Sequence, residues 1–421
     1  MQLLYIVVAL AGGAYLLGVR RRPDAFTVAF FSAAIYFLPA IAGYTLSPTS
    51  PRSPVKLPVT IEPEAMLIMA AVTSIIVLAT MAWDRLDQAR PPPNWVLEDS
   101  GLAAWIALAL GTIGVAGTVL ESGGAAFTAD KSEVIELVGR GHLLWQMGAT
   151  LGTVLAYVRR QRLAAVVGWV LLALDMWIGF RYAFATTFIA IGLLWLSRSG
   201  PVRLGAIRLR YVAVILAGGL FLISFQNLKE PLRAGDWAEI QVRLGNPLWY
   251  VNGILTSEPF TTQTVLNEIV RNDFHTSSEH LVAASYHLIL FAPALGEEAV
   301  RFNKVYQPAL FPLVDHGLAN NIWAQMWSAG GWPLLVAFTL VFVLVLGVWS
   351  RLLRSADPAV RSYAAIAAAY WGFYLHRNEL MGVVGSQKQL LLVTIACIAL
   401  AILVARVARN IDRSRPAMAE D

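Results

Sequence analysis

The sequence predicts an all-α polytopic membrane protein, and three observations support this fold class. Of its 421 residues, 57% are hydrophobic and only 14% are charged, whereas soluble domains carry about 25% charged residues. The apolar residues fall into runs long enough to cross ~30 Å of hydrocarbon as helices, and such runs recur along the whole chain. The runs lack the alternation of a membrane strand, so we expect helices, which satisfy their own backbone hydrogen bonds.

About 11 such runs are long enough to be membrane-spanning helices. They cover residues 1–18, 25–46, 63–83, 101–121, 142–158, 163–180, 182–197, 210–227, 331–350, 359–376 and 388–406. The basic cluster from Arg20 to Arg22 follows the first run, whereas a cleavable signal peptide carries its charges before the apolar stretch. We therefore expect the first run to be an uncleaved helix.

The expected helices divide the chain into three segments. Residues 1–225 carry the first eight helices, residues 226–330 form one large outer loop, and residues 331–421 carry the last three helices and a tail. Within the loop, residues 281–295 (LVAASYHLILFAPAL) are apolar but too short for a full crossing. We expect an interfacial or re-entrant helix there, which would hold the loop at the membrane surface.

Charge predicts the orientation of the chain. Of the 32 Lys and Arg residues, 19 lie in one set of short alternate connectors. By the positive-inside rule these connectors are cytoplasmic, which places the N-terminus outside and the C-terminus inside. The net charge of +5 is then an orientation signal, and no nucleic-acid partner is expected. The sequence has no GxxxxGK[ST] motif, so ATP-driven transport by this chain alone is not expected either.

Metal chemistry gains little support from the sequence. The single cysteine, Cys397, lies in the last apolar run and can form no intramolecular disulfide. Neither HExxH nor CxxC occurs, and no Asp-x-Asp pair is present to hold a metal-bound sugar nucleotide. All six histidines nevertheless fall on the expected outer side: His142, His275, His280, His287, His316 and His376. We expect no metal and no cofactor.

Arginines at the outer helix ends are the more informative residues. Arg181 lies where two expected helices meet almost without a loop, and Arg377 lies at the outer end of the tenth helix. Each could extend to lipid headgroups. Alternatively, both could converge on a diphosphate, which a planar guanidinium binds through two hydrogen bonds. The long loop offers three further arginines for this purpose, Arg233, Arg243 and Arg271.

One acidic residue lies within an expected span. Asp175 precedes Arg181 by less than two helical turns. It could pair across helices and orient Arg181, or it could form a buried polar contact that holds the helices together.

The segment before the ninth expected helix brings polar residues to the membrane surface. On a helix, Asn321 and Gln325 share one face. The run Ser328-Ala329-Gly330-Gly331 predicts a break between this polar helix and the next span. His316 could act as a general base, since imidazole titrates near neutral pH, or it could simply satisfy the loop.

These motifs together resemble the O-antigen polymerases (Wzy-like), membrane enzymes that polymerise lipid-linked oligosaccharide repeat units. The resemblance rests on the many-span layout with one large late outer loop and on four local features. These are Ser122-Gly123-Gly124 followed by Lys131 and Arg140, Gly179-x-Arg181, Asn321 to Gln325 leading to Ser328 to Gly331, and the arginine at the outer end of the penultimate span.

The resemblance implies a GT-C-like helical fold in the bacterial inner membrane, with the large loop in the periplasm. It implies a metal-independent glycosyltransferase that uses a glycan donor linked to undecaprenyl diphosphate. The implied partners are that lipid-linked oligosaccharide, the membrane lipids, a chain-length regulator and a flippase. The resemblance assigns catalytic roles to His316, Arg181 and Arg377. It assigns substrate binding to Arg271, Arg243, Arg233, Asn321, Gln325, His376, Glu379, Lys131, Arg140, Asp175 and Tyr182.

Other functions remain open at this point. The sequence has no Arg-x10-Gly pair in the long loop, a feature of some polymerases, so the choice among the loop arginines is not fixed by a motif. Related O-antigen ligases tend to carry His-Asn near this position, whereas His316 and Asn320 are not adjacent here, which favours a polymerase. A transporter or lipid flippase also needs many helices, but it usually shows internal repeats and midplane charges. An unreactive assembly scaffold is the third alternative.

Overall fold

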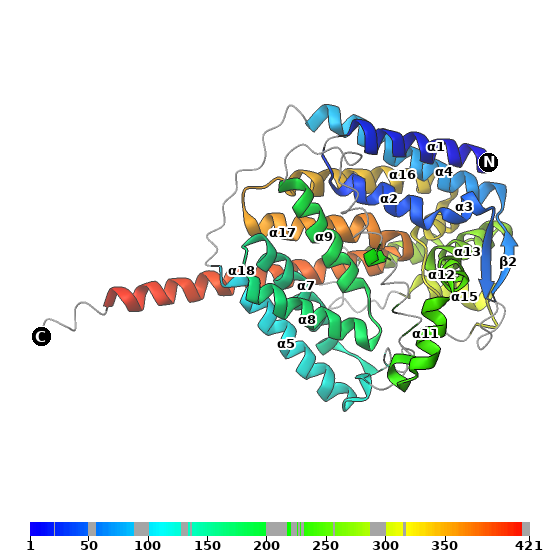
Figure 1. Cartoon of the computed structure of the whole chain (residues 1–421). Helices are drawn as coiled ribbons and strands as arrows, with labels where there is room; N and C mark the ends of the chain where they lie inside the picture. The colour runs from blue at the N-terminus through cyan, green and yellow to red at the C-terminus, as the bar shows by residue number, and fades with distance from the viewer. Residues whose placement is uncertain are drawn as a thin grey trace, which may run out of the picture. The chain divides into compact units, whose positions relative to one another are not determined.

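The computed structural model describes residues 1–20, 22–48, 56–87, 101–127, 137–198, 231–255, 257–286, 300–314 and 317–414, with a few short pieces between them. These residues are helical apart from connecting turns and one two-stranded sheet (Figure 1). Among them, five helices are long and apolar enough to cross a membrane. The expected class of α-helical membrane protein is thus confirmed, while the count of 11 spans stays a prediction. Most of the expected span 210–227 lies outside the described residues.

The chain divides into two compact units, each assembled from separate stretches of sequence. The first unit comprises Met1–Arg90, Ser199–Val348 and Tyr370–Gly385. The second unit comprises Pro91–Arg198, Trp349–Ala369 and Ser386–Asp421.

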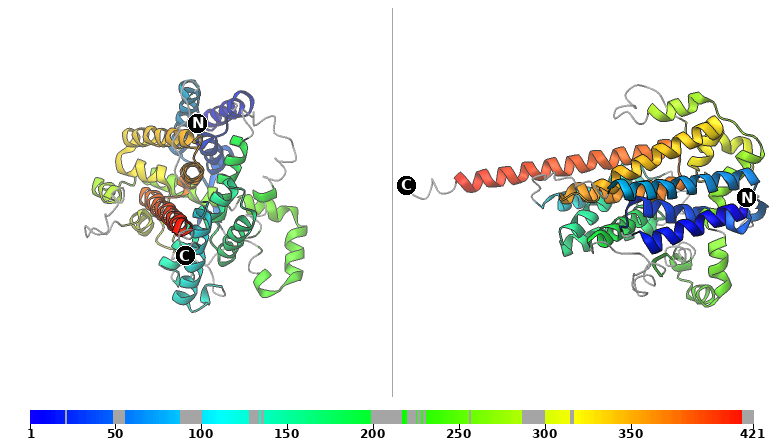
Figure 2. Two further views of the ribbon diagram at one scale, coloured as in Figure 1. Left: turned by 90° about the vertical axis from the view of Figure 1, so that its left-hand side faces the viewer. Right: turned by 90° about the horizontal axis from the view of Figure 1, so that it is seen from above.

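The first unit begins with a group of apolar helices. Helix α1 (Gln2–Ala14) runs into a π-helical turn, η1 (Tyr15–Val19), and α2 (Ala25–Tyr36) follows. Helix α4 (Pro63–Asp87) packs against both α1 and α2, as Figures 1 and 2 show. The expected first and third spans therefore correspond to helices of the structure.

The expected span 25–46 is wrong beyond Tyr36. Helix α2 ends there, a short helix α3 (Leu38–Ala42) follows, and Gly43 turns the chain with φ of 80°. Pro39 lies in the first turn of α3, where its missing N–H is tolerated, but it could not have continued α2. The next residues form strand β1 (Tyr44–Pro48) rather than helix.

Strand β1 belongs to a two-stranded hairpin, and one helix of the outer loop packs on this hairpin. It pairs antiparallel with β2 (Lys56–Thr60), with Tyr44 opposite Thr60. Helix α13 (Glu258–Arg271) packs on this hairpin, and the Thr264 hydroxyl donates to the Leu46 carbonyl at 2.8 Å. The hairpin therefore fixes one end of a segment that is more than two hundred positions later in the chain.

The described part of the expected outer loop is a series of short helices. Besides α13 these are α11 (Trp237–Gly245), α12 (Pro247–Leu255), α14 (Ser278–Tyr286) and α15 (Phe302–Leu310). Of the expected interfacial helix at 281–295, the structure describes only the part up to Tyr286, which is helical.

Helix α16 (Ile322–Leu352) contains the break expected from the Ser-Ala-Gly-Gly run. Gly330 and Gly331 both leave the helical conformation, and Gly331 has φ of 58° and ψ of −150°. Glycine adopts this combination without the steric cost of a Cβ atom. The Ser328 carbonyl accepts a hydrogen bond from the Thr276 N–H at 2.9 Å, so a loop residue binds beside the break. The break at Ser328 to Gly331 is confirmed.

The second unit is built on four apolar helices in sequence. They are α5 (Ala103–Ser122), α7 (Arg140–Val158), α8 (Arg162–Ile178) and α9 (Tyr182–Arg198), and a short 3-10 turn, η2 (Ala125–Phe127), follows α5. Helices α5 and α7 approach closely through glycines. A Cβ atom at Gly114 would lie 2.2 Å from the Trp145 backbone nitrogen, and one at Gly148 would lie 2.5 Å from the Gly111 nitrogen. Small residues of this kind let membrane helices pack at short distance.

The last helices differ in extent from the expectation. Helix α17 (Pro358–Phe373) ends before the expected limit of 376, and His376 and Arg377 lie in a 3-10 turn, η5 (Tyr374–Arg377). Helix α18 (Leu380–Ser414) begins eight residues earlier than the expected start at 388. The polar residues near the start of α18, such as Gln387 and Lys388, mask its beginning in a hydropathy profile.

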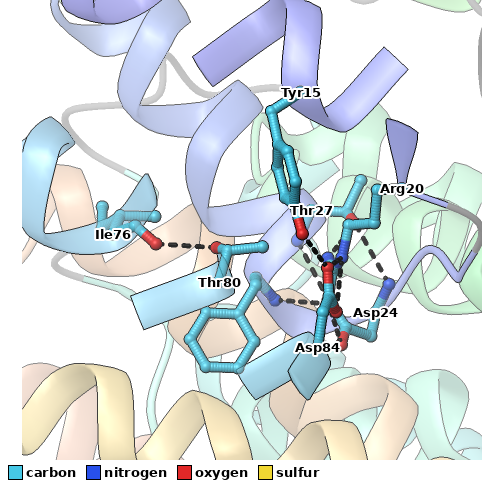
Figure 3. A network of polar contacts seen from close by, with 8 residues as sticks. Tyr15, Arg20, Asp24, Thr27, Ile76, Thr80 and Asp84 are labelled. Carbon is cyan, nitrogen blue, oxygen red and sulfur yellow. Dashed lines mark hydrogen bonds and ion pairs between the residues drawn. The ribbon is translucent and has the colours of Figure 1, made fainter. Parts of the chain in front are cut away.

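A buried ionic cluster joins the first helices (Figure 3). The Arg20 guanidinium donates to both oxygens of Asp24, each at 2.7 Å, and to Asp84 at 3.0–3.1 Å. Asp24 also caps α2 by accepting from the backbone N–H groups of Phe26 and Thr27. Tyr15 donates its hydroxyl to Asp84 at 2.9 Å. One arginine thus connects the end of α1 and η1 to the start of α2 and the end of α4.

We expect Arg20→Ala to lower the free energy of unfolding by about 3–5 kcal/mol, because it leaves Asp24 and Asp84 without their cation. The Arg20 side chain is only 2% exposed, so water cannot replace it. Chemical unfolding in mixed micelles measures the change. Arg22→Ala is the matched control, because Arg22 is exposed. Equal stability of the two variants would contradict a structural role for the cluster.

We expect Gly148→Ala to destabilise the second unit by about 1–3 kcal/mol, since the added Cβ meets backbone atoms that cannot rotate away. Those atoms are the Gly111 nitrogen at 2.5 Å and the Ala107 oxygen at 2.6 Å. Gly192→Ala in α9 is the control, because a Cβ there meets nothing within 4 Å. The control should gain about 0.5–1 kcal/mol from helix propensity. Thermal unfolding of both variants decides whether α5 and α7 pack this closely.

Candidate functional site

Asn321 joins the outer loop to the start of α16. Its side-chain oxygen accepts from the N–H groups of Trp323 at 3.0 Å and Ala324 at 3.2 Å, so it caps the helix. Its amide nitrogen donates to the Thr262 carbonyl at 3.2 Å and to the Gln263 side chain at 3.3 Å, both on α13. Asn321 is fully buried. This residue therefore fixes where α13 lies against α16.

Gln325, one turn further along α16, binds two other segments. Its oxygen accepts from the Leu380 N–H at 2.9 Å, at the start of α18. Its amide nitrogen lies 3.4 Å from Nε2 of His280 on α14. Since the amide nitrogen is a donor, His280 accepts through Nε2 and carries its proton on Nδ1. Partial burial lowers the pKa of His280, so its imidazole is neutral at pH 7.

His376 is enclosed by aromatic side chains. The Trp323 indole N–H donates to Nδ1 of His376 at 3.1 Å, and the ring stacks on Tyr36 at 5.8 Å between centroids. Phe37 and Phe342 also pack edge-on against the imidazole. With Nδ1 accepting, the ring is neutral. His376 is fully buried. In this structure it therefore connects η5 to the start of α16, through Trp323, and to the end of α2, through Tyr36.

Arg377 and Glu379 differ sharply in exposure. Arg377 donates to Glu258 at 2.6 Å, and its guanidinium lies 5.2 Å from the centre of the Tyr374 ring. Arg377 and Glu258 are each 27% exposed. Glu379 is buried and accepts from the Phe302 N–H of α15. Burial raises the pKa of Glu379, and the Phe302 hydrogen bond and the charge of Arg301 only partly counter this effect.

These six residues form one group, which we call the loop cluster: His280, Asn321, Gln325, His376, Arg377 and Glu379. The bonds that tie these residues to other segments join positions more than 40 apart in sequence. Five of the six were predicted as site residues, and the structure brings them together. His280 was considered only as a metal ligand.

The loop arginines have partners of their own. Arg271, at the end of α13, donates to Glu62 at 2.9 Å, to Glu268 at 2.9 Å and to the Thr60 carbonyl at 2.8 Å. Arg271 and Glu258 lie at opposite ends of α13, which is about 20 Å long. Arg243 pairs with Glu239 one turn away on α11. Arg233 is half-buried near the start of α11. The structure thus assigns Arg271 to the contact between α13 and the hairpin.

A second polar group lies in the unit that contains α7, α8 and α9. Asp175 on α8 is fully buried and lies 2.7 Å from Nε2 of His142 on α7. Gln146 donates to both oxygens of Asp175, at 3.1 and 3.0 Å. Tyr182, the first residue of α9, donates to the Gln146 side-chain oxygen. We call these four residues the His142 network; its contacts agree with the interpretation of Asp175 as a buried contact between helices.

Several predicted site residues remain outside these two groups. His316 and Lys131 lie outside the described residues. Arg140 is the exposed first residue of α7, next to a turn whose Gly139 and Gly141 N–H groups donate to Glu121. Arg181 is half-buried and belongs to the second unit, whereas Arg377 belongs to the first. Their convergence on one ligand therefore stays a prediction.

Among the described residues, no group of three or more His, Cys, Asp or Glu side chains is arranged to hold a metal ion. No known family model, curated protein or solved structure matches this chain.

We expect Glu379→Gln to change how stability depends on pH. Because burial raises the pKa of Glu379, the folded chain holds a proton where the unfolded chain, with a carboxyl pKa of about 4.3, has lost it. The free energy of unfolding of the wild type therefore decreases as the pH rises through this interval. That of the variant does not show this decrease, because glutamine does not ionise. The melting temperature of the variant relative to the wild type should increase between about pH 4 and pH 7.

Glu64→Gln is the control for this measurement. Glu64 lies exposed in the first turn of α4, so its replacement reports the loss of one exposed carboxylate. The melting temperatures of Glu379→Gln and the wild type could instead differ by a constant amount over the whole interval. That result would show that Glu379 ionises as an exposed carboxyl does.

Proposed function

We propose that this chain is a bacterial inner-membrane glycosyltransferase of the polymerase type. It transfers a growing glycan from undecaprenyl diphosphate to a lipid-linked repeat unit at the periplasmic face, with the N-terminus in the periplasm and the C-terminus in the cytoplasm. The observation that supports this proposal most is the loop cluster. Residues of the outer loop and of the helix ends bind one another directly there, and Arg377, Glu258 and His280 remain partly exposed beside buried amides.

Glycosyl transfer from a diphosphate needs two kinds of group. A hydroxyl oxygen of the acceptor sugar forms a bond to the anomeric carbon of the donor, and the bond from that carbon to the diphosphate oxygen breaks. The electron pair leaves with the diphosphate, so cations must stabilise the negative charge that develops there. The proton of the attacking hydroxyl passes to a base. Fixed arginines supply the first need and a neutral imidazole the second.

Arg377 has the properties that the leaving group requires. Its guanidinium is always charged and can bind two phosphate oxygens at once. In the free protein Glu258 occupies one side of it at 2.6 Å. Glu258 thus holds the guanidinium in one orientation before substrate binds. An incoming diphosphate would then take the place of this carboxylate. Removing one such electrostatic group typically lowers the rate ~10²- to 10³-fold.

The base is proposed to be His316, which precedes α16 in the sequence. His280 is a second, neutral histidine in the cluster, but its accepting nitrogen Nε2 already receives the Gln325 amide hydrogen bond at 3.4 Å, so it could take a proton only once that bond is broken. A positioned base contributes ~10²- to 10⁴-fold to the rate. Asn321 and Gln325 then support the site chiefly by holding α13, α14 and α18 around it.

A lipid-linked oligosaccharide flippase is the second candidate, and one observation favours it. His142 and Asp175 form a buried pair between α7 and α8, and ionisable pairs among membrane helices are common in transporters. An O-antigen ligase would share the proposed donor chemistry and differ only in its acceptor.

We expect Arg181→Ala, Arg377→Ala and His316→Ala each to abolish long polysaccharide in a cell whose own copy of the gene is deleted. The arginine variants lose stabilisation of the leaving diphosphate, and the histidine variant loses the base. Arg377→Lys should also be impaired, because an ammonium group cannot bind two oxygens in a fixed plane. Gel electrophoresis of surface glycan gives the length distribution, and immunoblotting gives the protein level.

Arg22→Ala serves as the control, since Arg22 is exposed and has no proposed role in the reaction. Full-length polymer from all three alanine variants, at normal protein levels, would overturn the proposed site.

A further inference from the structure

We infer that the His142 network positions Arg181. This inference rests on the proposed function only for the ligand that Arg181 binds. The positioning itself follows from the contacts of the second unit. Phe180 precedes Arg181 and its ring contacts His142 of the network, while Tyr182 follows Arg181 and is itself a member of the network.

The first contact is made by Phe180. Its ring lies 4.2 Å from the His142 imidazole, centroid to centroid, at an angle of 49° between the planes. His142 is itself held by Asp175 at 2.7 Å. The position of Phe180 therefore depends on the same buried pair.

The second contact is made by Tyr182, and it leaves the Gln146 amide a single orientation. The amide nitrogen lies 3.1 and 3.0 Å from the two oxygens of Asp175 and donates to them. The amide oxygen consequently faces Tyr182 and accepts a hydrogen bond from its hydroxyl. One side chain of α7 thus connects the last turn of α8 to the first residue of α9.

The backbone around Arg181 is restrained as well. Helix α8 ends with the Phe180 N–H bonded to the Asp175 carbonyl at 3.1 Å and the Gly179 N–H bonded to the Met176 carbonyl at 3.1 Å. This is a Schellman motif, and Gly179 provides the left-handed residue with φ of 115°. The Arg181 carbonyl then accepts from the Ala185 N–H at 2.9 Å and begins α9. Arg181 lies between two helix ends that share the network.

A purely structural purpose would not require this chemistry. Well-packed apolar residues usually stabilise a core as well as a buried ionic or hydrogen-bonded group does, because desolvation offsets the attraction. What directed hydrogen bonds add is a unique geometry. Here the hydrogen bonds fix the positions of Phe180 and Tyr182, the residues on either side of the half-buried Arg181. His142, Gln146, Asp175 and Tyr182 are accordingly positioning residues, and Arg181 is the residue that binds the diphosphate.

The first experiment tests the positioning without using activity. The chain has one cysteine, so Cys397→Ala followed by Arg181→Cys allows a single nitroxide label at position 181 of the full chain in lipid nanodiscs. We expect Gln146→Leu and Tyr182→Phe to make this label more mobile by electron paramagnetic resonance. Tyr182→Phe removes one hydroxyl and is the variant least prone to misfolding.

Thr153→Val is the matched control, because the Thr153 hydroxyl is buried in the same helix but bonds only its own helix at Ala149. Label mobility equal to that of the control in both network variants would overturn the inference. A more mobile label in Tyr182→Phe at unchanged helix content would support it.

The second experiment asks whether the network acts through Arg181, with farnesyl diphosphate as the probe and calorimetric titration as the measurement. We expect Arg181→Ala to weaken binding about tenfold or more, and Gln146→Leu to weaken it about threefold or more when Arg181 is present. In the Arg181→Ala background, Gln146→Leu should change the affinity less than about twofold. Equal losses in both backgrounds would mean that the network supports the fold alone, and would overturn the inference.

The two experiments separate failure of the inference from failure of the proposed function. If Arg181→Ala leaves farnesyl diphosphate binding unchanged, the proposed diphosphate contact is wrong, and the label at position 181 still decides the positioning. If Arg181→Ala weakens binding while both network variants leave the label and the affinity unchanged, the proposed function stands and the inference falls.

Discussion

A polar group enclosed by apolar helices must find its partner within the protein, and the rest of this structure depends on that constraint. An unpaired amide or charge in such surroundings costs several kcal/mol, roughly 2–7 for a neutral group. The chain meets this constraint by joining segments that are distant in sequence. Arg20 binds the ends of α2 and α4, Asp175 binds two residues of α7, and Gln325 binds the start of α18.

The same constraint explains the arrangement of the candidate site. In the loop cluster the buried side chains of Asn321, Gln325 and Glu379 bond to the protein itself, so they act as anchors for α13, α14 and α15. Arg377 and its partner Glu258 keep some exposure, and under the proposed function Arg377 is the member of the cluster that would meet the diphosphate. Groups held in place before substrate arrives need little reorganisation in the transition state, which is the main advantage of an electrostatic site.

Much of the helical layout could be predicted from the sequence. Apolar runs of the right length predicted α1, α4, α5, α7, α8 and α9, and the Gly330-Gly331 pair predicted the break in α16. The hairpin after α3 could not be predicted in this way, because Tyr44 to Leu46 continue an apolar run and their strand partner lies beyond residues 49–55. Hydropathy reports which residues avoid water, and it does not report which strand or helix they pair with.

The composition of the site was predictable in part. Asn321 and Gln325 share a helix face, as their spacing indicated, and both are buried and bonded. Their partners Gln263 and His280 depend on tertiary structure and carry no local signal. The His142 network did have such a signal: His142 and Gln146 are one turn apart on α7 and face the same carboxylate, Asp175. A search for polar pairs at helical spacing opposite a buried acid would have found it.

The most direct test of the central claim is reconstitution of the purified full chain in vesicles with an undecaprenyl-diphosphate-linked repeat unit as the sole substrate. The account predicts that lipid-linked glycans grow longer by whole repeat units, with release of undecaprenyl diphosphate and without added metal or nucleotide. Movement of the unit across the vesicle membrane with no change in glycan length would contradict it and favour a flippase.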